Sequence, residues 1–175
     1  IEVIESAGKP LLLDADGLKA FAEFKRRLNV PLVLTPHAGE YAILTGRKVL
    51  ENLNERVSEV QKTAAELGAV ILLKGPVDVI SDGKRFKLNF TGNPGMTVGG
   101  TGDVLSGIVG AFLAQQNEAF EAATAGAFVN GAAGDFVLEE KGYHMISTDL
   151  IDWVPHVLND PFSHLKVRKT SAKAS

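Results

Sequence analysis

Cysteine is absent from the 175 residues of this sequence. Its absence excludes disulfide bonds, thiolate nucleophiles and zinc sites built from cysteine ligands. Histidine and acidic residues nowhere occur at the spacing of metal ligands, so the sequence predicts no metal site built from side chains alone. The lack of disulfides suits the reducing cytoplasm, and we expect the protein to be located there.

Long apolar runs and an excess of one charge are also missing. No run approaches the ~20 residues of a membrane span, and the sequence does not start like a signal peptide. The 18 basic and 21 acidic residues are well mixed and give a net charge of −3, unlike the basic surface of nucleic-acid-binding proteins. We therefore expect neither a membrane nor a nucleic acid as a partner.

Short apolar segments bounded by polar residues or glycine alternate with segments of helical periodicity. The sequence predicts strands over 10–14, 32–35, 69–74, 77–81 and 85–90, the last two joined by a hairpin turn at Asp82-Gly83. Helices are expected from Asp16, after His37, over 53–67, over 101–138 as two helices, and from about Ser147 through Trp153. Strands that are apolar on both faces indicate a three-layer α/β sandwich with a mainly parallel sheet. We expect one domain over residues 1–165, followed by a mobile tail over residues 166–175 that lacks periodicity.

A glycine-rich turn, Gly99-Gly100-Thr101-Gly102, precedes a strongly periodic helix. Without side chains at three of the four positions, the backbone N–H groups of a helix start can approach an anion closely. Asp103, in the first turn of this helix, could accept a proton from a hydroxyl that attacks phosphorus. Alternatively it is only a favourable acid at a helix start. The turn matches neither the Walker nor the dinucleotide-binding pattern.

The longer context resembles the ADP/ATP-dependent NAD(P)H-hydrate dehydratases of the ribokinase-like superfamily. Four blocks in the order of that family carry the resemblance. They are LLLDADGL (11–18), LTPHAGEYAILTG (34–46), LLKGPVDVISDG (72–83) and NPGMTVGGTGDVLSGIVGAFLA (93–114).

The resemblance implies a ribokinase-like fold and a two-step repair reaction. A nucleotide, ADP or ATP with Mg²⁺, phosphorylates the C6 hydroxyl of hydrated NADH or NADPH. Elimination of phosphate then restores the reduced cofactor. It also implies a homo-oligomer.

The resemblance assigns the site residues by motif. Asp103 corresponds to the catalytic base and contacts the substrate, together with His37 and Asn93. The residues implied to bind the nucleotide are Lys74, Gly75, Pro76, Val77, Asp78, Gly99, Gly100, Thr101 and Gly102.

Several neighbouring residues have two interpretations each. Asp78 stands where the family form has threonine, so it could accept a ribose hydroxyl but not donate as threonine does. Glu40 could cap the helix that follows His37 or orient His37. Asp14 and Asp16 could line the site, although we favour Asp16 as a helix cap. The other histidines, at positions 144, 156 and 164, match no motif and are expected on the surface or in packing.

Complete members of the family have further strands and helices before the segment that matches residues 11–18. We therefore expect the N-terminal portion of the domain, including part of the nicotinamide pocket, to be missing here. Two alternatives to the dehydratase stay open. One is a kinase of the same superfamily acting on a vitamin precursor or a sugar, and the other is a nucleotide-binding fragment without turnover.

Overall fold

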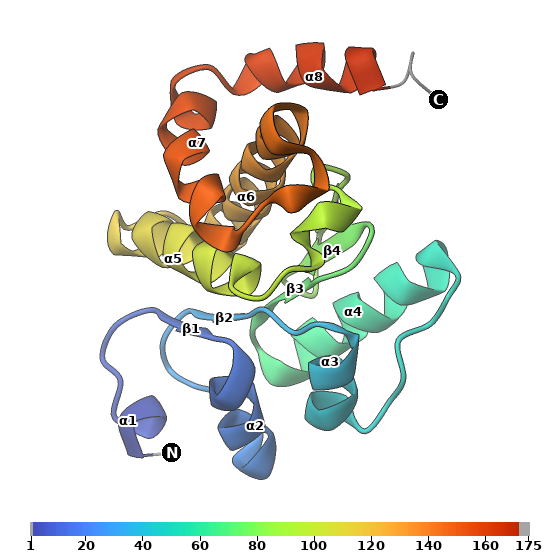
Figure 1. Cartoon of the computed structure of the whole chain (residues 1–175). Coiled ribbons are helices and arrows are strands. Elements are labelled where there is room, and N and C mark those ends of the chain that lie inside the picture. Colours follow the sequence, from blue (N-terminus) through green and yellow to red (C-terminus); the bar gives the residue numbers. More distant parts are fainter. Residues whose placement is uncertain (1, 172–175) are drawn as a thin grey trace.

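The computed structural model describes residues 2–171, and the side chains of residues 2–167, as an alternation of helices and strands (Figure 1). In chain order the elements are α1 (Glu2–Glu5), β1 (Leu11–Leu13), α2 (Ala15–Phe24), β2 (Leu32–Leu34), α3 (Ala38–Thr45), α4 (Leu53–Leu67), β3 (Val70–Leu73), β4 (Asp78–Ser81), β5 (Phe86–Asn89), the 3₁₀ helix η1 (Pro94–Thr97), α5 (Thr101–Ala114), α6 (Ala119–Lys141), the 3₁₀ helix η2 (Gly142–His144), α7 (Ser147–Asn159), the 3₁₀ helix η3 (Pro161–Ser163) and α8 (His164–Ser171).

The strands form one sheet in the order β1-β2-β3-β4-β5. Strands β1, β2 and β3 pair in parallel, with Leu13 opposite Leu34 and Leu34 opposite Ile71. Strand β4 is antiparallel to both of its neighbours, so β5 again runs in the direction of β3. The predicted α/β fold with a mainly parallel sheet is confirmed, and the expected hairpin at Asp82-Gly83 joins β4 to β5.

Helices cover both faces of the sheet, as Figure 1 shows: α2, α3 and α4 lie on one side and α5 and α6 on the other. Alternate strand residues point to opposite faces. Val33, Leu72 and Ile80 pack against α5 and α6. The residues between them pack against α2, α3 and α4; this second set includes Leu34, Ile71 and Val79. This two-sided burial explains why β1, β2 and β3 are apolar throughout.

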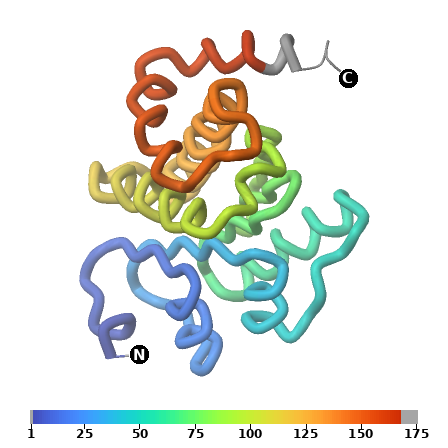
Figure 2. Tube along the Cα trace, viewed as in Figure 1, coloured from blue at the N-terminus to red at the C-terminus, as the bar shows by residue number. Residues whose placement is uncertain are grey.

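A further layer of helices lies over α6. Val129, Ala133 and Val137 of α6 share a buried cluster with Leu150 and Val157 of α7. This contact is why α6 is apolar nearly all round, as its sequence indicates. The first and last parts of the described chain therefore lie at opposite ends of the molecule (Figure 2). Within residues 2–171, no helix combines the length and apolarity that crossing a bilayer requires.

The predicted tail begins inside a helix. Residues 164–171 form α8, and Val167 is buried in the cluster that α6 and α7 share. Among the described side chains of α8, His164 and Val167 are buried. Two positions one turn apart are too few to show a period in the sequence. The structure thus places a helix over part of the expected tail. The mobility of the tail and the division of the chain at residue 165 stay predictions. Residues 172–175 lie outside the described residues.

Candidate active site

The carboxyl ends of β1, β2 and β3 meet at one edge of the sheet. Beyond the paired residues, Thr35 donates its N–H to the carbonyl of Leu13 (3.2 Å), and Lys74 donates its own to the carbonyl of Pro36 (2.8 Å). The expected alignment of Asp14, Thr35 and Lys74 along a common edge is confirmed. In open α/β sheets this edge is where ligands bind.

Helix α5 begins at the same edge with an uncovered N-terminus. Gly100 is its N-cap at φ 95°, and no side chain caps the helix. A Cβ on Gly100 would lie 2.5 Å from the hydroxyl of Ser147, so both conformation and space require glycine. Thr101 donates its hydroxyl to the carbonyl of Met96 (2.8 Å) and thereby ties the helix start to η1. The first N–H groups of α5 have no intrahelical acceptor and suit an anion.

A charged pair lies beside this helix start. The ammonium of Lys74 is 2.9 Å from Asp14 Oδ1 and 3.7 Å from Glu40 Oε2. The hydroxyl of Ser106, one turn into α5, donates to Asp14 Oδ2 (3.2 Å). A Cβ on Gly102 would lie 3.5 Å from both Lys74 Nζ and Asp14 Oδ2. Lys74, far from Gly102 in the sequence, therefore brings a positive charge to the N-terminus of α5.

Residues 74–78 form the turn from β3 into β4. Asp78 holds this turn together, because its Oδ1 accepts the N–H of Gly75 (3.0 Å) and its Oδ2 accepts Nδ2 of Asn89 (2.9 Å). Burial raises the pKa of Asp78 above its ordinary value, although the hydrogen bonds from Asn89 and Gly75 oppose the shift. Pro76 and Val77 lie in the same turn. Lys74, which precedes it, extends to the start of α5, where a Cβ on Gly102 would lie 3.5 Å from its ammonium. A ribose contact by Asp78 remains a prediction.

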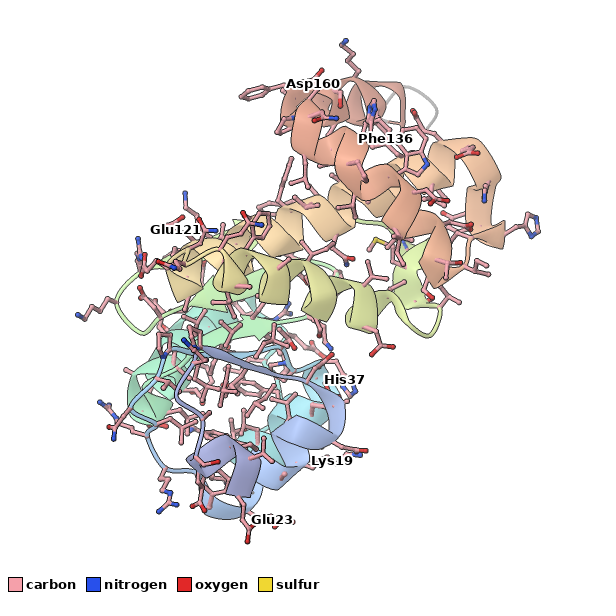
Figure 3. All side chains as sticks on the ribbon, turned by 90° about the vertical axis from the view of Figure 1, so that its left-hand side faces the viewer. Lys19, Glu23, His37, Glu121, Phe136 and Asp160 are labelled. Carbon is pink, nitrogen blue, oxygen red and sulfur yellow. The ribbon has the colours of Figure 1, made fainter. Side chains whose placement is uncertain are left out.

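His37 is the N-cap of α3. Its Nδ1 accepts the N–H groups of Gly39 (3.0 Å) and Glu40 (3.3 Å), and Glu40 Oε2 accepts the N–H of His37 (2.8 Å). This is a reciprocal capping box, which confirms the capping role considered for Glu40. Since Nδ1 is an acceptor, the neutral ring carries its proton on Nε2. Its Nε2 lies 3.5 Å from Oε1 of Glu40, so Glu40 also orients the ring. The His37 side chain is 60% exposed and lies between the lower helices and α5 in Figure 3, where a ligand can reach it.

Asn93 forms the turn that leads to η1. Its Oδ1 accepts the N–H of Gly95 (3.0 Å), and its Nδ2 donates to Asp135 Oδ1 on α6 (3.0 Å). Sequence reasoning missed Asp135 and its partner His164, which was expected only on the surface or in packing. Asp135 is the single acid in the apolar stretch from Ala122 to Leu138. This was the available signal, because a buried carboxylate needs partners.

Asp103 and Asp16 are both exposed acids in the first turn of a helix. The cap role favoured for Asp16 is wrong. The N-cap position of α2 belongs to Asp14, and Asp16 instead forms a 2.7 Å ion pair with Lys19 on the surface. Asp14 lines the site and Asp16 does not. Asp103 lies next to Gly102 at the helix start, as the sequence predicts.

Two cavities of the described residues lie away from this edge. One of about 530 Å³ is on the outer side of α4, lined by Asn54, Glu55, Ser58, Glu59 and Lys62. The other, of about 230 Å³, is lined by residues of α5, α6 and the loop between them. Neither includes a residue of the predicted site.

A glycine-rich helix start beside a lysine, at the carboxyl edge of a mainly parallel sheet, is an arrangement typical of phosphate-binding α/β proteins. Comparison with known proteins identifies the family within this class. The profile of the NAD(P)H-hydrate dehydratase family matches residues 1–156. The chain belongs to this family.

Individual relatives agree with the family. The chain is 52% identical over 153 residues to the bifunctional NAD(P)H-hydrate repair enzyme Nnr of Pyrobaculum aerophilum, covering 87% of the chain and 30% of that protein. It is 48% identical over 134 residues to the ADP-dependent (S)-NAD(P)H-hydrate dehydratase of Cenarchaeum symbiosum, covering 77% of the chain and 46% of that protein.

A solved structure confirms the ribokinase-like fold. The ADP/ATP-dependent NAD(P)H-hydrate dehydratase of Bacillus subtilis, co-crystallised with ATP and Mg²⁺, superposes with a TM-score of 0.79 at 32% identity. The match covers 90% of this chain and 57% of that one. The chain thus spans less than half of the two curated relatives and little more than half of this enzyme.

Proposed function

We propose that this chain carries the nucleotide-binding and base-bearing part of an ADP- or ATP-dependent NAD(P)H-hydrate dehydratase. One observation supports this most: Gly102, at the uncapped N-terminus of α5, faces the Lys74–Asp14 pair, and a Cβ there would lie 3.5 Å from Lys74 Nζ and from Asp14 Oδ2. The reaction is inferred from the activity for which the relatives are named. The position of Gly102 indicates where the phosphates of the nucleotide would bind.

The phosphates of the nucleotide would lie on the N–H groups of Thr101, Gly102 and Asp103. Gly99, where a Cβ would meet no atom within 4 Å, leaves open space in front of the helix. Lys74 adds a positive charge, and the 75–78 turn lines the other side. Within residues 2–171, no three histidine or acidic side chains converge on a point. Mg²⁺ would therefore be held mainly by the nucleotide phosphates, as is common for this ion, and would neutralise their charge.

Asp103 is placed to act as the base. Its carboxylate is exposed at the helix start, next to the N–H groups that would hold the transferred phosphoryl group. It would accept the proton of the C6 hydroxyl as oxygen attacks phosphorus, which turns the hydroxyl into a good leaving group. Loss of phosphate, helped by the lone pair of the ring nitrogen, and loss of a proton from the ring carbon next to C6 then restore NADH or NADPH. His37 would donate its Nε2 proton to the hydrated cofactor. Asn93 would contact the substrate through the Nδ2 proton that it does not donate to Asp135.

Two further properties extend this proposal. We place the enzyme in the cytoplasm, where its nicotinamide substrates are used and where a chain without cysteine needs no oxidising environment. We also infer a homo-oligomer, on the resemblance to the family alone. Size-exclusion chromatography with light scattering tests the second point, and a single-chain mass would contradict it.

The deciding experiment incubates the protein with hydrated NADH, Mg²⁺ and either ADP or ATP. We expect the absorbance of the reduced nicotinamide to return and free phosphate to appear in equal amount. A phosphorylated product that accumulates without recovery of absorbance would instead identify a small-molecule kinase. Nucleotide binding without phosphate release would identify a binding module without turnover.

A further inference from the structure

One buried carboxylate fastens the turn that leads into the start of α5. Asp135 Oδ1 accepts Nδ2 of Asn93 (3.0 Å), and its Oδ2 accepts the N–H of Gly92 (3.1 Å). Asn93 in turn accepts the N–H of Gly95 (3.0 Å). Asp135 is 8% exposed, so its charge is compensated by these donors rather than by water. The shape of this turn therefore depends on one residue of α6.

Helix α6 approaches this turn without intervening side chains. A Cβ on Gly131 would lie 2.7 Å from the carbonyl oxygen of Thr91, and one on Gly134 would lie 2.8 Å from Cγ of Met96. Both distances are too short for a real side chain. The two glycines bring the helix backbone against the turn, which sets the distance that the Asp135 side chain must span.

The carboxylate of Asp135 also contacts a histidine of α8. His164 at the start of α8 places Nε2 2.7 Å from Asp135 Oδ2 and is 2% exposed. The rings of Phe128 and Phe136 meet the imidazole edge-on, with centroids 5.9 Å and 6.3 Å away. The packing fixes the orientation of the imidazole and, through it, that of the carboxylate.

The same contacts continue to the phosphate site. Thr101 donates its hydroxyl to the carbonyls of Met96 (2.8 Å) and Val98 (3.2 Å), so hydrogen bonds join η1 to the start of α5. We propose that Asp135, held by His164, is a positioning residue that sets the turn of residues 92–97 and, through it, the N–H groups at Gly102. The catalytic consequence rests on the proposed function, whereas the control of the turn does not.

The pairing of Asp135 with Asn93 permits a test by exchange of polarity. Asp135→Asn places an amide donor against the Asn93 donor, and Asn93→Asp places two carboxylates together. The double variant, Asn93→Asp with Asp135→Asn, restores one donor and one acceptor. Its carboxylate at position 93 can still accept the N–H of Gly95, and its amide oxygen at position 135 can still accept from Gly92 and His164. Asp82→Asn is the matched control, because Asp82 also accepts two backbone N–H groups, from Lys84 and Arg85, at the opposite edge of the sheet.

The first readout is amide exchange followed by mass spectrometry, with segment 90–100 compared with β3. We expect each single variant to raise exchange in segment 90–100 at least about tenfold more than in β3, since one buried hydrogen bond lost corresponds to about that factor. The double variant should return to within about threefold of the parent. Equal changes in both segments, or no recovery in the double variant, would overturn the inference. This readout needs no nucleotide, so it stands even if the proposed reaction is absent.

The second readout is turnover of hydrated NADH with ADP and Mg²⁺. We expect kcat, or the affinity for ADP, to fall at least about tenfold in each single variant, to recover in the double variant and to stay level in Asp82→Asn. His164→Gln, which keeps a donor, should lose less than His164→Ala. Raised exchange in the turn with unchanged turnover and ADP affinity would show that the turn does not position the phosphate site, and would overturn that step.

Discussion

The ammonium of Lys74 lies 2.9 Å from the carboxylate of Asp14, although sixty positions separate the two residues in the chain. The pair exists because β1 and β3 end at the same edge of the sheet, with β2 between them. Glu40 adds a second carboxylate at 3.7 Å, so Lys74 has a fixed place beside the start of α5. This arrangement gives the first two predictions.

Replacing Gly102 with valine should weaken ADP binding at least about tenfold, because the side chain would occupy the space in which a phosphate meets charge-assisted N–H donors. The protein should still fold, since a Cβ there would have ordinary 3.5 Å contacts. Gly107→Val is the matched control: it places the same branched residue in the same helix, where a Cβ would meet no atom within 4 Å. Calorimetry that shows equal affinities in both variants would contradict the phosphate site.

Replacing Lys74 with methionine should lower the free energy of unfolding by about 1–3 kcal/mol, because Asp14 and Glu40 lose their cation while largely shielded from water. Combining Lys74→Met with Asp14→Asn should recover part of this loss, since one unpaired charge is then removed. Urea unfolding of the parent, the two single variants and the double variant gives the coupling free energy between Lys74 and Asp14. The control, Lys19→Met, breaks the exposed pair with Asp16 and should lower the free energy of unfolding much less than Lys74→Met, because exposed ion pairs contribute little. Similar costs in both pairs would show that the Lys74–Asp14 contact is unimportant.

Local pattern was sufficient for much of the fold. The helix predicted over 53–67 is observed with those bounds, because its apolar spacing is regular and Asn52 and Gly68 mark its ends. The three strand ends were also predictable, since parallel strands finish at one edge. The Lys74–Asp14 and Asp135–His164 contacts were not, because they join residues whose proximity depends on the packing of whole elements. In the same way, α8 owes its place to contacts with α6 rather than to its own period.

The raised pKa of Asp78 predicts a dependence of stability on pH. Because burial raises this pKa, the folded protein keeps a proton that the unfolded chain has lost. That stabilisation is complete below the ordinary value of 3.8 and is lost as the pH rises through the raised pKa. We therefore expect Asp78→Asn to become more stable relative to the parent as the pH rises above about 4. Urea unfolding over a pH series measures the difference.

Asp82 supplies the control for this pH series. Burial opposes the shift, but hydrogen bonds from Arg85 and Lys84 outweigh it and lower the pKa of Asp82. Its stabilisation is present above the ordinary pKa and is lost as the pH falls through the lowered one. Asp82→Asn should accordingly become less stable relative to the parent as the pH rises. The same sign of slope in both variants would mean that Asp78 is not the group responsible.

Asp103→Asn separates chemistry from binding. Asparagine keeps the size of the side chain and can accept a hydrogen bond, but it cannot take up the hydroxyl proton at neutral pH. General-base assistance is worth about 10²–10⁴-fold in rate, so kcat should fall by about that factor. The affinity for nucleotide should stay level or rise, because a negative charge leaves the phosphate site.

Asp16→Asn is the matched control, since Asp16 is another exposed acid in the first turn of a helix. If Asp103 serves only as a favourable acid at a helix start, the two variants should lose the same small amount of stability, and both should keep full turnover. Turnover of Asp103→Asn within about threefold of the parent would therefore remove Asp103 as the base and leave the glycine turn as a binding element.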